Sequence, residues 1–108
     1  MGLTAEVELE LRDAGLIKFF EDNQAAFQEM AVTSLTYTTT YVAPTGIPTR
    51  MDDVAETLET ALRTTELLRT FLHTKHLTQR YQYRRFADLI LNRLWEDIHN
   101  DTAAEERD

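Results

Sequence analysis

The clearest hydrophobic pattern lies in the C-terminal half of the chain. In residues 50–73 apolar side chains recur every three or four positions, the period of one helical face: Val54, Leu58, Ala61, Leu62, Leu68, Phe71 and Leu72. Residues 80–99 repeat the pattern with Phe86, Leu89, Ile90, Leu94 and Ile98. The sequence therefore predicts two long antiparallel helices that supply most of the core, with an interruption within residues 74–82.

The N-terminal pattern fits two structures. Residues 3–14 alternate as a half-buried strand would, but Leu3, Val7 and Leu11 also share one helical face. Glutamate and leucine favour a helix, so we predict a helix that starts after Thr4. Residues 16–31 predict further helical structure, broken near Asp22 and Asn23.

Residues 32–43 carry the pattern of a strand, because β-branched and aromatic side chains dominate them. One expected face holds Leu35, Tyr37, Thr39 and Tyr41. A lone strand has unpaired edges, which pairing with the same strand of a second copy would satisfy, and a homodimer is expected. The alternative is a monomer in which the N-terminal segment is the second strand. The predicted fold is α+β, mainly α, with one domain over residues 1–100 and a frayed polar tail over 101–108.

Composition narrows the class of protein. The chain has 108 residues, a net charge of −8 and no cysteine, so disulfides and zinc–thiolate sites are excluded. It has no apolar run of membrane-spanning length and no secretion signal at its start, and we expect a cytoplasmic protein that does not enter membranes. No catalytic group, metal site or cofactor is predicted, and an enzyme is not expected.

The cations are concentrated in one stretch. Seven of the eleven Lys and Arg residues lie between Arg63 and Arg93, opposed there only by Glu66 and Asp88. Cations with interleaved tyrosines can contact phosphates and bases, which makes this stretch a candidate for binding a partner or nucleic acid. The candidate residues are Lys75, Arg80, Tyr81, Tyr83, Arg84 and Arg85. The alternative is a helix face that neutralises the acidic remainder of the chain.

Two weaker patterns involve histidine. His73 and His76 are three residues apart, and Glu96-x-x-His99 has the spacing used in di-iron helical bundles, which need two such motifs. Arg93 and His99 have a separation found in some helical ribonucleases, but a six-residue step does not place both on one helical face.

These observations favour a small acidic, non-enzymatic interaction protein that regulates or inhibits a protein partner. Its acidic surface, from Glu6 to Glu29 and from Asp52 to Glu66, would face a basic partner, and a viral or plasmid origin fits this role. The first alternative is a DNA-binding regulator that uses the basic stretch and a dimeric β-ribbon, since strand–helix–helix is the element order of such readers. The second is a helical nuclease or metal-binding bundle.

Overall fold

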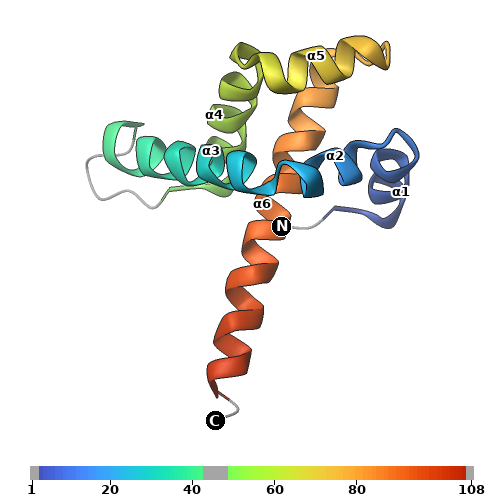
Figure 1. The fold of residues 1–108 in the computed structure, drawn as a ribbon. Helices are drawn as coiled ribbons and strands as arrows, with labels where there is room; N and C mark the ends of the chain where they lie inside the picture. The colour runs from blue at the N-terminus through green and yellow to red at the C-terminus, as the bar shows by residue number, and fades with distance from the viewer. Residues whose placement is uncertain (1–2, 43–48, 107–108) are drawn as a thin grey trace.

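The chain folds into helices joined by short connections (Figure 1). The structure is a computed structural model that describes the backbone of residues 3–42 and 49–106 and the side chains of residues 3–41 and 49–97. Its elements are α1 (Ala5–Asp13), α2 (Leu16–Asp22), α3 (Gln24–Tyr37), the π-helical η1 (Thr38–Val42), α4 (Met51–Thr64), α5 (Glu66–Thr74) and α6 (Arg80–Glu106).

The predicted strand is wrong, and with it the α+β class. Residues 32–42 are helical, Ala43 lies outside the described residues, and no strand occurs in the parts of the chain that the structure describes. The buried positions of this segment, Ala31, Ser34 and Thr38, have helical spacing. Because these side chains are small or polar, the burial pattern is hidden in the sequence, and the tyrosines and threonines dominate the pattern instead.

The N-terminal segment is helical, as predicted. The Thr4 hydroxyl accepts a hydrogen bond from the Val7 amide at 3.2 Å and caps α1. Gly15 separates α1 from α2 with φ of 78°, in the left-handed region that glycine adopts readily. The break predicted near Asp22 occurs at Asn23.

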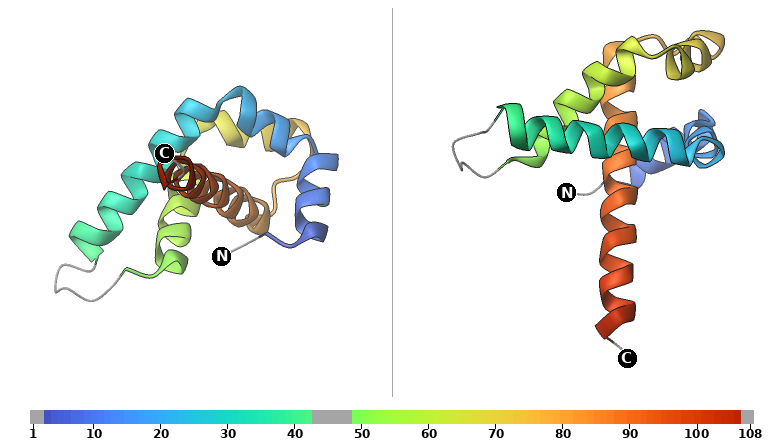
Figure 2. Two further views of the ribbon diagram at one scale, coloured as in Figure 1. Left: turned by 90° about the horizontal axis from the view of Figure 1, so that it is seen from below. Right: turned by 60° about the vertical axis from the view of Figure 1, so that its left-hand side comes forward.

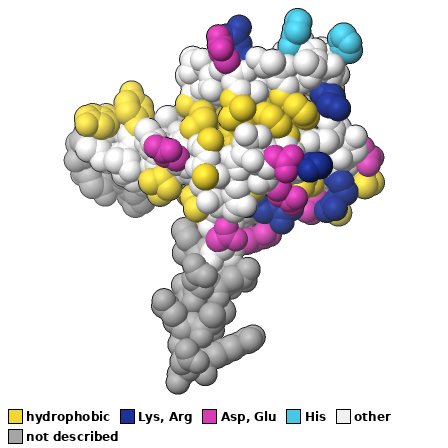
Figure 3. Space-filling model, in the orientation of Figure 1, with side chains coloured by type: hydrophobic (Ala, Val, Ile, Leu, Met, Phe, Trp, Pro, Cys, Tyr) yellow, Lys and Arg dark blue, Asp and Glu magenta, His cyan; other side chains and the backbone are white. Residues whose placement is uncertain are grey.

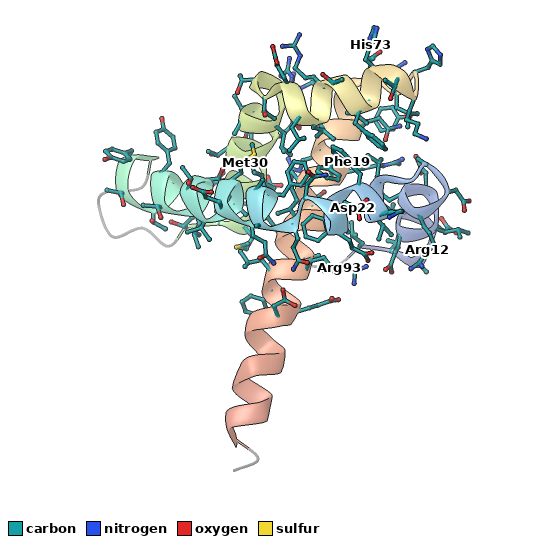
Figure 4. All side chains as sticks on the ribbon, in the orientation of Figure 1. Arg12, Phe19, Asp22, Met30, His73 and Arg93 are labelled. Carbon is teal, nitrogen blue, oxygen red and sulfur yellow. The ribbon has the colours of Figure 1, made fainter. Side chains whose placement is uncertain are left out.

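The predicted helix over residues 50–73 is interrupted at Thr65, which has extended backbone angles between α4 and α5. The series of buried apolar side chains is interrupted at this point, since none lies between Leu62 and Leu68. The interruption lets α5 lie across the top of the molecule, where Phe71 stacks on Phe19 of α2 with ring centroids 4.1 Å apart (Figures 1 and 4).

Helix α6 is the centre of the fold. Figure 2 looks along it from below, with α1, α2, α3 and α4 around it. Its segment from Gln82 to Leu91 is buried on more than half of its circumference. The helix spans 27 residues, or about 40 Å, and continues to Glu106, beyond the predicted range of 80–99. None of the described helices is both long and apolar enough to cross a membrane.

The core contains all five phenylalanines of the chain. Phe27 of α3 and Phe86 of α6 meet edge to face at 4.8 Å, and Phe19, Phe20 and Phe71 surround them. Aliphatic side chains of α4, α5 and α6 extend this core upward along the central helix, including Leu58, Leu62, Leu68, Leu72 and Ile90. The aromatic cluster therefore fixes α2, α3 and α5 against α6, while α4 packs through smaller side chains.

Candidate functional site

Most of the arginines in the basic stretch form ion pairs within the molecule. Arg80 contacts Glu59 at 3.2 Å, Arg84 contacts Asp52 and Asp88, Arg85 contacts Glu10, and Arg93 contacts Glu8 at 3.1 Å and Glu96. Four of the seven cations between residues 63 and 93 are thus matched by carboxylates, and each of the four contacts a carboxylate on another helix. These arginines fasten α6 to α1 and α4, which matches the alternative of internal neutralisation.

The pKa values of Arg84 and Asp88 both differ from their ordinary values. The hydrogen bond to Asp52 raises the pKa of the Arg84 guanidinium above its ordinary value. Burial raises the pKa of the Asp88 carboxyl, although the charge of Arg84 acts in the opposite direction. The positive charge of Arg84 therefore offsets only part of the cost of burying the ionised Asp88 carboxylate.

The other predicted residues of the stretch do not form a continuous basic surface. Tyr81 is half-exposed and lies under the Arg85 guanidinium, 4.9 Å from ring centroid to carbon. The Lys75 ammonium lies 5.6 Å from the Phe71 ring centroid. Tyr83 is buried, with 9% of its surface exposed.

The residues of the expected dimer strand lie on a helical surface. Leu35 and Tyr37 belong to α3, and Thr39 and Tyr41 belong to η1. Tyr37 and Tyr41 are exposed and pack on each other at 5.5 Å, while the Thr39 hydroxyl donates to the Leu35 carbonyl at 3.0 Å. Since this segment has no strand edge, the reason for expecting a homodimer through it is removed.

The histidine patterns do not converge on a metal site. His73 and His76 are both exposed at the end of α5, and the side chain of His99 lies outside the described residues. Among the residues that the structure describes, no group of three or more His, Asp or Glu side chains is placed to hold a metal ion.

The best-formed concave surface is a groove between α3 and α4, which lie side by side (Figure 2). Its outer part has a volume of 610 Å³, in the range of ligand sites. A second hollow of 370 Å³ adjoins it and shares Thr33, Ser34 and Ala61. We call the two together the α3–α4 groove; the outer part is lined by Thr33, Ser34 and Tyr37 of α3 and by Asp53, Glu56, Thr57, Thr60, Ala61 and Thr64 of α4.

Hydroxyl groups hold the two helices together beneath the groove. The buried Thr38 hydroxyl lies 2.7 Å from the Ser34 carbonyl oxygen and 3.2 Å from the Thr57 hydroxyl. Having a single proton, it donates to only one of them at a time. Small side chains such as Ser34 and Ala61 line this interface, so the space above it stays open.

The wall formed by α4 presents hydrogen-bond acceptors. Thr57 donates its hydroxyl proton to the Asp53 carbonyl at 3.0 Å, and Thr60 donates to the Glu56 carbonyl at 3.1 Å. Thr64 donates to the Ala61 carbonyl at 2.8 Å. A hydroxyl whose proton is used in this way offers only lone pairs to a ligand. The threonine row on α4 is therefore a row of acceptors.

Carboxylates at the groove add negative charge. Asp53 and Glu56 line the outer part, and Glu29 lines the adjoining hollow. None of the three has an ion-pair partner within residues 3–41 and 49–97, unlike Asp52 and Glu59 on the α6 side of α4. The half-exposed Tyr37 ring forms part of the opposite wall, and Figure 3 shows acidic side chains beside hydrophobic ones over α3.

Ser34 provides a donor at the junction of the two hollows. It is 3% exposed, and its hydroxyl has no hydrogen-bond partner among the described residues. Ser34 lines both hollows of the groove.

Sequence reasoning missed this groove because it predicted a strand over residues 32–43, which include the second half of α3. One signal was present: Thr57, Thr60 and Thr64 recur at helical spacing beside Asp53 and Glu56. That spacing places the five side chains along one side of α4, where the structure shows them at the groove.

Comparisons of this chain with protein families, with curated proteins and with solved structures find no match.

Proposed function

We propose that this protein is a small acidic interaction protein that binds a cationic segment of a partner protein in the α3–α4 groove and thereby regulates that partner. The observation that carries the proposal is the acceptor wall of α4, where three threonine hydroxyls donate to backbone carbonyls and two carboxylates have no ion-pair partner among the described side chains. Arginine and lysine side chains bring donors and no acceptors, so they complement such a wall.

The charge of the protein also favours a cationic segment in the groove. The chain carries 19 acidic and 11 basic residues, and its arginines on α6 are already paired. The negative charge that remains available includes Glu29, Asp53 and Glu56 at the groove. A negative field of this kind speeds the approach of a basic segment, and the Tyr37 ring offers a face for a guanidinium.

The groove supports binding rather than catalysis. Its lining contains carboxylates and hydroxyls but no histidine, lysine or cysteine, so no general base of those types stands beside the Ser34 hydroxyl. Regulation would follow from covering a basic surface that the partner needs for another ligand, such as a nucleic acid.

The test uses a nona-arginine peptide as the probe and isothermal titration at low and moderate salt. The double variant Asp53→Asn/Glu56→Gln should weaken binding about tenfold or more, because two charge-assisted contacts are lost. The control Glu6→Gln/Glu21→Gln removes the same charge from exposed sites on α1 and α2.

The control should change affinity by about threefold or less, the effect of long-range charge alone. Equal weakening by both double variants would show that the peptide senses only the net charge, and the groove would then not be the site. Thr60→Val sharpens the result, since it removes one acceptor without changing charge and should weaken binding about two- to fivefold.

A further inference from the structure

We propose a second site, independent of the groove: a pocket between α5 and the start of α6 that binds a small phosphate monoester. The pocket has a volume of 540 Å³, and its lining comes from α5, from the connection that follows it and from Tyr83 of α6. The residues that carry the argument are Arg69, Thr70, His73, Thr78 and Tyr83, opposed by Glu66.

The cations of this pocket differ from the other arginines of the stretch. Arg69 has no ion-pair partner within the described residues, whereas Arg80, Arg84 and Arg85 each contact a carboxylate on another helix. His73 projects from the outer side of α5 one turn beyond Arg69, and histidine and basic side chains stand along this edge (Figures 3 and 4). A guanidinium and an imidazole thus line one cavity, and both can donate to an oxyanion.

The Tyr83 hydroxyl supplies the observation that points to a ligand. Only 9% of the surface of Tyr83 is exposed, and its hydroxyl has no hydrogen-bond partner among the described residues. Tyr83 lines the pocket, which is the concave surface that the structure shows beside this ring. A buried ring therefore holds a donor at the wall of the cavity.

Two of the three threonines in this pocket contrast with the row on α4; the third, Thr74, donates its proton to the Phe71 carbonyl at 2.6 Å. Thr70 and Thr78 have no hydroxyl hydrogen bond within the described parts of the chain, so their protons are available. Together with Arg69, His73 and Tyr83 they can donate five or more hydrogen bonds, which suits the three acceptor oxygens of a phosphate monoester. The negative charge of the Glu66 carboxylate repels a phosphate and lowers the affinity of the pocket for it.

The test titrates phenyl phosphate into the intact protein at low ionic strength, followed by calorimetry and by amide NMR shifts. Arg69→Gln should weaken binding about fivefold or more, and Arg63→Gln, which removes a cation from the neighbouring exposed end of α4, should change it by less than about twofold. Glu66→Gln should tighten binding about twofold or more by removing repulsion.

Tyr83→Phe should weaken binding about two- to fivefold while the far-ultraviolet circular dichroism stays unchanged. Equal effects of Arg69→Gln and Arg63→Gln, or binding of a single-stranded oligonucleotide with no binding of phenyl phosphate, would overturn the proposal. The groove variant Asp53→Asn/Glu56→Gln should bind phenyl phosphate at least as well as the wild type, so the two sites fail or succeed separately.

Discussion

The two sides of α6 are packed by different kinds of side chain. On one side the phenylalanines of α2, α3 and α5 close around Phe86 and fill the space between the helices. On the other side α4 contributes no aromatic residue and meets its neighbours through leucines, threonines and ion pairs.

The difference explains where the groove lies. Where α4 meets the end of α3 and η1, Ser34, Thr38 and Thr57 make the contact through groups with little bulk, and the groove stays open beside them. The aromatic side should therefore be sensitive to truncation of its rings, while the exposed residues of α4 that line the groove should tolerate changes that alter binding.

The largest effect is expected at Phe27, which is fully buried and packs against Phe19, Phe20 and Phe86. Phe27→Ala should lower the free energy of unfolding by about 3–5 kcal/mol, because it removes a ring and leaves a cavity. Urea denaturation measures this, with the exposed Leu9→Ala on α1 as the control, expected to cost about 0.5 kcal/mol or less. A loss at Phe27 no larger than at Leu9 would break the comparison between the two sides.

A smaller effect is expected for the hydroxyl that joins α3 to α4. Thr38→Val keeps the shape of the side chain but removes its contacts with the Ser34 carbonyl and the Thr57 hydroxyl, so it should cost about 1 kcal/mol. Thr39→Val is the matched control, since its hydroxyl is exposed and bonds only within its own helix. Similar unfolding free energies for the two variants would show that the hydroxyl bridge contributes nothing.

The smallest effect concerns Asp88 at the charged edge of α4 and α6. Its pKa is raised by burial, so the folded state binds a proton more tightly than the unfolded state, and ionised Asp88 lowers stability above its folded-state pKa. This penalty is relieved as pH falls through that pKa. The free energy of unfolding of the wild type minus that of Asp88→Asn should therefore increase, by about 1 kcal/mol or less, between neutral pH and about pH 4.

Urea titrations of both proteins at several pH values give this difference. Asp22→Asn, at an exposed carboxylate paired with Lys18, is the charge-matched control. A difference that falls with decreasing pH, or that rises equally in the control, would contradict the assignment of the effect to burial at Asp88.

The prediction from sequence was correct for the helices whose buried side chains are large and apolar. Leu58, Leu62, Phe86 and Ile90 occupy the core as their spacing indicates, and Thr4 caps the first helix. It failed in residues 32–42, where the buried side chains are small or polar and the hydroxyls of helical threonines donate to carbonyls one turn earlier. Local preference for extended structure was overridden there by packing against α4 and by the continuation of α3.

The candidate sites were harder to predict than the helices. A count of charge along the chain finds the basic stretch but cannot see that Arg85 reaches Glu10, 75 residues away in sequence. Nor can it distinguish a threonine whose hydroxyl donates to a backbone carbonyl, such as Thr60, from one whose hydroxyl proton is available to a ligand, such as Thr70. Both distinctions depend on which helices become neighbours.

The central position of α6 also bears on how the protein is made. A ribosome delivers α1 to α5 before it delivers Phe86, Leu89 and Ile90, the residues against which those helices pack. At about 5–20 residues per second, the earlier helices spend seconds with their apolar faces uncovered. Assembly of this protein therefore waits for its own centre to be synthesised, and in that interval the nascent chain is a natural client for chaperones.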